Sequence, residues 1–202
     1  MKLFYKPGAC SLASHIILRE SGAGFELEAV DTDIGRTQSG MDFSEINPKG
    51  YVPVLQLESG DVLTEGAAIL QYIADHCAPG RLAPTAGTIE RVRLQEHLNY
   101  VSSELHKAFG AFFSGTATEA DKDNARASLN SKFNYLNDLF ADDREYLSGS
   151  DFSVADAYLF VVSNWANFVG INLHPWPRIA RFVERVSKRP AVQEAFKAEG
   201  LV

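Results

Sequence analysis

The sequence has few cysteines and lacks any apolar run long enough to cross a membrane. Its 202 residues include two cysteines, Cys10 and Cys77. They could form at most one disulfide, which excludes the dense crosslinking of small secreted domains. A membrane-spanning helix needs roughly 20 consecutive apolar residues, and the chain reaches Pro7-Gly8 too soon for a signal-peptide core. We therefore expect a soluble, cytoplasmic protein with no membrane partner.

The chain also lacks an excess of positive charge. Its 26 acidic residues outnumber 19 basic ones, which gives a formal net charge of −7. Because this balance repels phosphate groups, we expect no nucleic-acid partner. The residues are 46% hydrophobic and 22% charged, so disorder and collagen-like repeats are excluded. The chain can bury a sizeable core as one compact unit or two small domains.

Residues 1–80 alternate between strand-like and helical patterns. Strand-like runs lie at 2–5, 25–30, 51–57 and 62–63, and helical patterns lie at 11–21 and 65–77. Small and polar residues at 58–61 suit a hairpin turn, and Thr64 is a candidate cap for the second helix. This order predicts an α/β unit in which two parallel strands and a hairpin share one sheet.

The rest of the chain reads as helical. Two prolines and two glycines between residues 78 and 88 interrupt any regular element, so we place a linker at 81–87. Helical patterns follow at about 89–113, 120–140, 154–169, 177–188 and 192–197. Residues 88–202 are therefore predicted to form a second, all-α domain.

Four short stretches, taken together, resemble one protein family. They are Phe4-Tyr5-Lys6-Pro7-Gly8-Ala9-Cys10-Ser11, Asn47-Pro48-Lys49-Gly50-Tyr51-Val52-Pro53, Leu63-Thr64-Glu65-Gly66 and Glu104-Leu105-His106-Lys107. Each is unspecific alone, but their order and spacing resemble the bacterial beta class of glutathione transferases over essentially the whole chain. The resemblance implies a thioredoxin-like α/β N-terminal domain that binds glutathione. It also implies an all-α C-terminal helical bundle that contributes the electrophile site and the dimer interface.

Cys10 lies where the first predicted helix begins. The unpaired N–H groups and the dipole of a helix N-terminus favour a thiolate, whereas a free cysteine can also be a small buried apolar residue. The resemblance implies that Cys10 forms a mixed disulfide with glutathione. Ser11 either places a hydroxyl near the sulfur or caps the helix. Residue 13 is alanine, so no Cys-x-x-Cys pair is present, and Cys77 is expected to serve packing.

The resemblance implies that two further segments bind glutathione. It implies a cis Val52-Pro53 bond that turns the backbone N–H and C=O of Val52 toward the cysteinyl part of glutathione. The residues alone favour an ordinary trans proline, because few X–Pro bonds are cis. At the second predicted helix, free N–H groups, including that of Gly66, suit the γ-glutamyl carboxylate, and Glu65 faces its ammonium. Helix capping explains Thr64 and Glu65 equally well.

Family members often carry a lysine near position 35 that meets the glycyl carboxylate of glutathione. This sequence has Gly35 and Arg36 there. We expect Arg36 to substitute for the lysine.

In the second domain, Asn99, Ser103 and His106 share one helical stripe beside the apolar one. A histidine can donate or accept a proton near neutral pH, although a solvated helix face explains the stripe as well. The resemblance implies that His106 and Lys107 lie near the active-site sulfur. It also implies that Asn99, Ser103 and Glu104 reach glutathione, some of them across a dimer interface.

Aromatic residues of the second domain suit an apolar pocket. Trp165, with Phe113 and Phe168, could form a wall for the electrophile, although at least one of the three is expected to pack in the core. The segment from Ser153 to Asp156 has the pattern of a capping box, which we read as a determinant of stability.

The hypothesis is a homodimeric glutathione transferase that acts in detoxification. It would conjugate the glutathione thiolate to hydrophobic electrophiles, with glutathione as co-substrate and no metal. One alternative is thiol-disulfide exchange or peroxidase activity through a Cys10–glutathione disulfide. A second alternative is a non-catalytic interaction module, because fold does not fix function.

Overall fold

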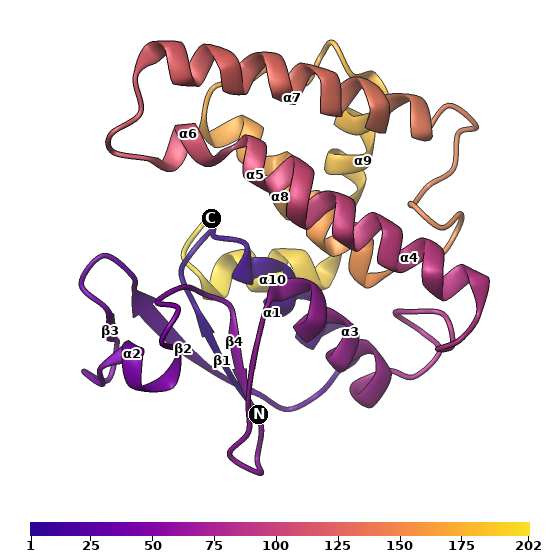
Figure 1. Cartoon of the computed structure of the whole chain (residues 1–202). Coiled ribbons are helices and arrows are strands. Elements are labelled where there is room, and N and C mark those ends of the chain that lie inside the picture. The colour runs from indigo at the N-terminus through magenta and orange to yellow at the C-terminus, as the bar shows by residue number, and fades with distance from the viewer. The chain divides into compact units, whose positions relative to one another are not determined.

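The computed structural model describes all 202 residues (Figure 1). The chain forms two compact units. The first comprises Met1–Thr85 together with Lys188–Val202, and the second comprises Ala86–Ser187. No helix of the chain is both long enough and apolar enough to cross a membrane.

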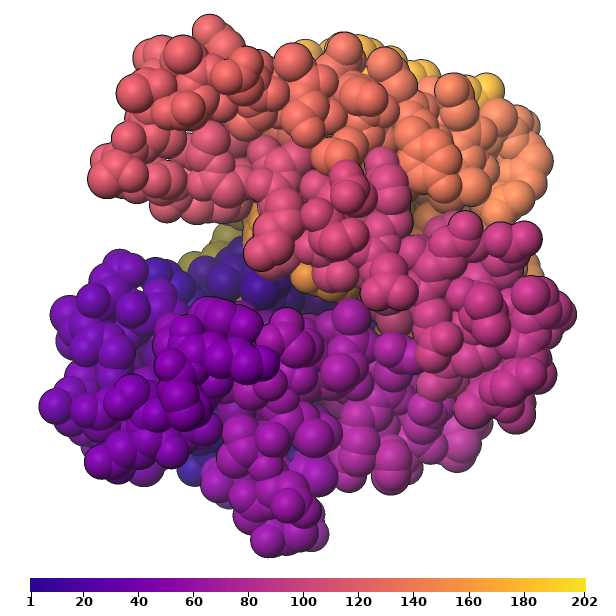
Figure 2. All heavy atoms as spheres, in the orientation of Figure 1, coloured from indigo at the N-terminus to yellow at the C-terminus, as the bar shows by residue number.

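A five-stranded sheet forms the centre of the first unit. Its strands are β1 (Lys2–Tyr5), β2 (Glu26–Asp31), β3 (Arg36–Thr37), β4 (Val54–Gln56) and β5 (Val62–Thr64), in the order β3-β2-β1-β4-β5. β1 and β2 are parallel and the other pairs are antiparallel. The predicted parallel pair and hairpin are confirmed, while the short strand β3 was not predicted. The hairpin tip protrudes from the first unit in Figure 2.

The helices of the first unit are α1 (Ser11–Ser21), α2 (Phe43–Ile46) and α3 (Gly66–Cys77). α1 and α3 pack against each other, and α1 ends at Gly22, whose φ of 75° suits a residue without a side chain. The predicted cap of α3 is wrong. Thr64 is the last residue of β5, and Glu65 occupies the N-cap position without a side-chain capping bond.

The last helix, α10 (Pro190–Ala198), belongs to the first unit, whereas the sequence boundary placed it in the helical domain at 88–202. It packs on α1, as Figure 1 shows. Arg189 is bound to Glu20, with 2.7 Å between Nε and Oε1, and Glu199 lies 2.8 Å from His15. A helical sequence pattern cannot reveal which unit its apolar face will cover, so the boundary was wrong here.

The second unit is all-α, as predicted. Its elements are α4 (Ile89–Tyr100), η1 (Val101–Leu105), α5 (His106–Ala108), α6 (Gly110–Phe113), α7 (Glu119–Leu139), α8 (Val154–Phe168) and α9 (Pro177–Ser187). The helix expected over 89–113 is divided, because η1 is a π-helical turn. Such turns are often found at functional sites, and this one lies directly before His106.

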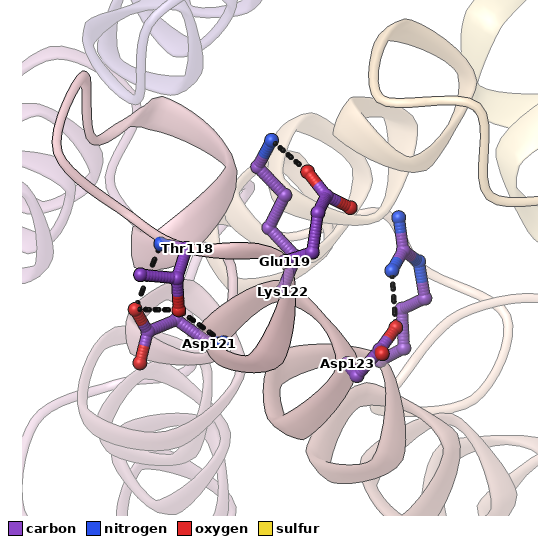
Figure 3. A network of polar contacts seen from close by, with 6 residues as sticks. Thr118, Glu119, Asp121, Lys122 and Asp123 are labelled. Carbon is purple, nitrogen blue, oxygen red and sulfur yellow. Dashed lines mark hydrogen bonds and ion pairs between the residues drawn. The ribbon is translucent and has the colours of Figure 1, made fainter.

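Capping boxes begin two helices of the second unit. At α7, the Thr118 N–H donates to Asp121 Oδ2 at 2.8 Å, and the Asp121 N–H donates to Thr118 Oγ1 at 3.2 Å (Figure 3). The box predicted at the start of α8 is confirmed. There the carboxylate of Asp156 accepts from the N–H and the hydroxyl of Ser153 at 2.9 and 2.6 Å. The box of α7 is exposed, while that of α8 is buried.

Candidate functional site

Cys10 occupies the N-cap position of α1, as the sequence indicated. Its thiol donates to the carbonyl oxygen of Val52, with 3.5 Å between sulfur and oxygen. Burial raises the pKa of the Cys10 thiol to about 11, against the smaller lowering effect of the backbone N–H groups of Cys10 and Ser11. The prediction of a thiolate is therefore wrong for this structure. That prediction considered the lowering of the thiol pKa by the helix N-terminus but not its larger rise through desolvation of the sulfur.

The hydroxyl of Ser11 is bound by the backbone of Lys6. It accepts from the Lys6 N–H at 3.2 Å and donates to the Lys6 carbonyl at 3.3 Å. Ser11 is the first residue of α1 rather than its N-cap, so the capping interpretation is wrong. Cys77 ends α3, and burial raises its thiol pKa as well, in line with the packing role expected for it.

The Val52-Pro53 peptide bond is cis, as the resemblance implied. Pro53 is buried, and a side chain at Gly66 would meet its ring, because an added Cβ would lie 3.7 Å from Pro53 Cγ. The first unit thus brings together the Cys10 thiol, the Val52 carbonyl and the first residue of α3.

Glu65 adopts an unusual backbone conformation, with φ 68° and ψ 110°. Such a conformation is costly for a residue with a side chain, and these residues concentrate at functional sites. Its Oε1 lies 2.6 Å from Lys49 Nζ and accepts from the Tyr51 hydroxyl at 2.9 Å. Lys49 also donates to the hydroxyl oxygen of Thr64 at 3.0 Å.

Lys49 and Tyr51 are site candidates that the sequence analysis missed as individual residues. The bond to Glu65 raises the pKa of both side chains. The signal lay in the Asn47 to Pro53 stretch, where both residues stand, but only the fold brings them to the carboxylate. Glu65 thus holds an ammonium group, the same kind of group that the resemblance assigns to it in glutathione.

Gly35 and Arg36 form a turn and the start of β3. Gly35 has a φ of 68°, which glycine tolerates without strain. The Arg36 guanidinium donates to the Gly40 carbonyl at 3.3 Å and is exposed. Its assignment to the glycyl carboxylate stays a prediction.

In the second unit, His106 contacts two aromatic residues of α8. Its Nδ1 lies 2.8 Å from the Tyr158 hydroxyl, and its ring stands edge-on to Trp165 at 4.8 Å between centroids. Burial, and secondarily the charge of Lys107, lowers the pKa of His106 to about 4. The imidazole is therefore neutral at physiological pH.

The remaining polar candidates of this helix lie at the surface. The Ser103 hydroxyl donates to the Asn99 carbonyl at 2.9 Å. Glu104 pairs with Lys132, with 2.6 Å between Oε2 and Nζ. All three candidates, and Lys107, are exposed. Their contacts with glutathione stay predictions.

The three aromatic candidates differ in exposure. Trp165 is buried, and Phe113 stands edge-on to it at 5.1 Å between centroids. Phe113 and Phe168 are 57% and 64% exposed. Trp165 therefore packs in the core, while Phe113 and Phe168 present apolar surface. Tyr158 was missed, because in the sequence it is one aromatic residue within an apolar helix.

Comparisons with known proteins match both units. The family model described as "Glutathione S-transferase, N-terminal domain" matches residues 1–75, and the C-terminal domain model matches residues 98–190. Glutathione S-transferase GstA of Escherichia coli O157:H7 is 48% identical over 201 residues, which cover 100% of both chains.

Two solved structures extend this similarity. A sphingomonad glutathione S-transferase complexed with glutathione is 45% identical, with a TM-score of 0.95. A beta-class glutathione S-transferase of Sphingomonas chungbukensis is 46% identical, with a TM-score of 0.96. In both cases 100% of this chain and 100% of the other chain are covered.

Proposed function

The chain is an enzyme of the glutathione S-transferase family, of its bacterial beta class, and from this premise we propose that it binds glutathione in the first unit and conjugates it to hydrophobic electrophiles. The observation that carries the proposal is the Cys10 thiol at the start of α1, 3.5 Å from the carbonyl oxygen of Val52.

The first unit offers a matching group for each part of glutathione. The backbone of Val52 pairs with the cysteinyl part as an added strand would. The N–H groups at the start of α3, including that of Gly66, receive the γ-glutamyl carboxylate. The Glu65 carboxylate accepts the ammonium in exchange for Lys49, and Arg36, beside Gly35, receives the glycyl carboxylate.

In the conjugation step, the sulfur of deprotonated glutathione attacks the electrophile. A sulfur–carbon bond forms, and the leaving group departs with its electron pair. Cys10, protonated at neutral pH, gives up its bond to the Val52 carbonyl and donates its hydrogen to the glutathione sulfur instead. The exposed ring of Phe113, which packs edge-on against the buried Trp165, offers an apolar contact to the electrophile.

The second unit supplies polar side chains that take part in the reaction or contact glutathione. His106 donates a hydrogen bond in the reaction, and Lys107 adds positive potential that favours the glutathione thiolate. Asn99, Ser103 and Glu104 contact glutathione, some of them across the interface of a homodimer. The reaction requires no metal.

Thiol-disulfide exchange is a second candidate, favoured by the Cys10 thiol itself. Its thiolate would attack a sulfur of oxidised glutathione, form the mixed disulfide and release one glutathione. The thiolate of a second substrate would then attack the glutathione sulfur of that disulfide, leave as a mixed disulfide with glutathione and restore the Cys10 thiolate.

The first experiment is titration calorimetry of glutathione with freshly reduced protein whose mass confirms a free Cys10. We expect saturable binding near one site per chain. An absence of binding at millimolar glutathione would contradict both enzymatic functions and favour the non-catalytic interaction module.

Cys10→Ala then separates conjugation from exchange, with Cys77→Ala as the matched control. We expect Cys10→Ala to abolish exchange with oxidised glutathione and to retain part of the conjugation of an aryl halide. Cys77→Ala should leave both rates unchanged. Loss of conjugation together with exchange would mean that the Cys10 sulfur is required for both reactions.

A further inference from the structure

The imidazole of His106 is held by two residues of the same helix. Tyr158 and Trp165 lie seven residues apart on α8, which is two helical turns, so they share one face. The Tyr158 hydroxyl lies 2.8 Å from His106 Nδ1. The Trp165 ring meets the imidazole at an interplanar angle of 74°.

The side chains of Tyr158 and Trp165 that contact the imidazole are buried. Tyr158 is 5% exposed, and α8 is buried along most of its length. His106 itself follows the π-helical turn η1, where the regular helical hydrogen bonding is interrupted. The side chains of α8 therefore contribute to the orientation of the His106 ring.

A neutral imidazole has one N–H donor and one acceptor nitrogen, and its surroundings decide which nitrogen carries the hydrogen. Burial keeps His106 neutral at physiological pH. A phenol is a stronger donor than a neutral imidazole N–H, and an imidazole nitrogen is a stronger acceptor than a phenol oxygen. The favoured arrangement is therefore donation from Tyr158 to Nδ1, which leaves the hydrogen on Nε2.

We propose that Tyr158 is a positioning residue, which donates its hydroxyl hydrogen to Nδ1 of His106 and so presents an Nε2–H donor to the reacting groups. This inference rests on the proposed function of His106. In the conjugation step, the Nε2–H donates a hydrogen bond to the negative charge that develops on the electrophile or its leaving group. His106 thus acts as a donor rather than as a base.

The tautomer is measured directly by nuclear magnetic resonance on protein labelled with ¹⁵N in its histidine rings. The His106 signals are assigned by their loss in His106→Gln. We expect the Nε2–H tautomer in the unchanged protein and a mixture of tautomers in Tyr158→Phe. Tyr135→Phe, which removes a half-exposed hydroxyl in the same unit, should leave the signals as they are.

Two results would overturn the proposal. One is an Nδ1–H tautomer in the unchanged protein, because Tyr158 would then be the acceptor. The other is an identical set of His106 signals in Tyr158→Phe. Both are read without glutathione, so they test the positioning role even if the proposed function fails.

The kinetic test is a double-mutant cycle. Loss of one hydrogen bond predicts a roughly three- to tenfold fall in kcat for Tyr158→Phe, with glutathione affinity unchanged. Because Tyr158 acts through His106, the double variant with His106→Ala should be no slower than His106→Ala alone. Independent, multiplicative losses in the double variant would contradict the proposal.

His106→Gln separates a donor from a base. The glutamine amide can donate a hydrogen bond but cannot take up a proton, so this variant should keep more activity than His106→Ala. Equal activity of the two variants would overturn the donor role. If both match the unchanged enzyme while Tyr158→Phe still alters the tautomer, the proposed function of His106 fails and the positioning by Tyr158 stands.

Discussion

At the scale of single residues, the chemistry depends on whether two side chains are charged. The Cys10 thiol is protonated at neutral pH because burial raises its pKa to about 11. His106 is neutral because burial lowers its pKa to about 4. Desolvation disfavours the charged form in both cases, although it moves the two pKa values in opposite directions.

The Cys10 pKa predicts slow alkylation at neutral pH. We expect the rate of iodoacetamide modification to keep rising between pH 9 and pH 10.5, because the thiolate fraction increases until the pKa is passed. The measurement uses Cys77→Ala, so that Cys10 alone reacts, followed by intact mass. A rate that levels off below pH 8 would show instead that the helix N-terminus dominates.

The His106 pKa predicts a loss of stability in acid. Because its folded-state value lies below its ordinary value of about 6.5, the contribution of His106 is fully present above pH 6.5 and declines as pH falls toward 4. The unchanged protein should lose on the order of 2 kcal/mol more unfolding free energy than His106→Gln between pH 7 and pH 4.5. Urea unfolding at each pH measures this difference. The prediction would be contradicted if the unfolding free energies of the two proteins fell by the same amount between pH 7 and pH 4.5.

At the scale of elements, the two capping boxes differ in burial. The Asp156 carboxylate accepts from the N–H groups of Leu147 and Ser153 inside the second unit, whereas Asp121 caps α7 at the surface. We therefore expect the two capping boxes to contribute different amounts to the free energy of unfolding.

Asp156→Ala should lower the free energy of unfolding by about 3 kcal/mol, because it leaves buried donors unpaired. Asp121→Ala, the matched control, should cost about 1 kcal/mol, since water can satisfy its exposed partners. Urea unfolding at pH 7.5 compares the two variants. Equal losses would mean that burial adds nothing to the cap of α8.

At the scale of the whole molecule, the end of the chain completes the first unit. Glu199 accepts from the Gly8 N–H at 2.9 Å and binds His15 at 2.8 Å. Arg19 donates to Nε2 of His15 at 2.9 Å, so the hydrogen of His15 is on Nδ1 and points to Glu199. This buried network joins α10 to the segment that precedes Cys10.

Glu199→Ala should destabilise the protein by about 3 kcal/mol, because it removes an acceptor shared by the buried His15 ring and the partly buried Gly8 N–H. Glu194→Ala is the control on the same helix. Glu194 pairs with Arg19 at the surface, so its loss should cost less than about 1 kcal/mol. Thermal and urea unfolding report both values, and a Glu199 variant as stable as the control would contradict the importance of the network.

Features of this chain that depend on neighbouring residues were predictable from the sequence, and features that depend on distant residues were not. The strands of the first unit were predictable because their apolar runs are local, and the capping box of α8 because its residues are three positions apart. The contact of His106 with Tyr158 was not predictable, because 52 residues separate the pair. The bonds of Lys49 and Tyr51 to Glu65 likewise depend on the fold.

The sequence by itself determined the two-part architecture, the family and the identity of the candidate residues, since these follow from local patterns and short motifs. Tertiary structure alone decided the protonation of Cys10 and His106 and the placement of α10 with the first unit. The physical reason is that desolvation and packing depend on neighbours distant in sequence. A motif specifies which groups are present, and the fold decides their charge.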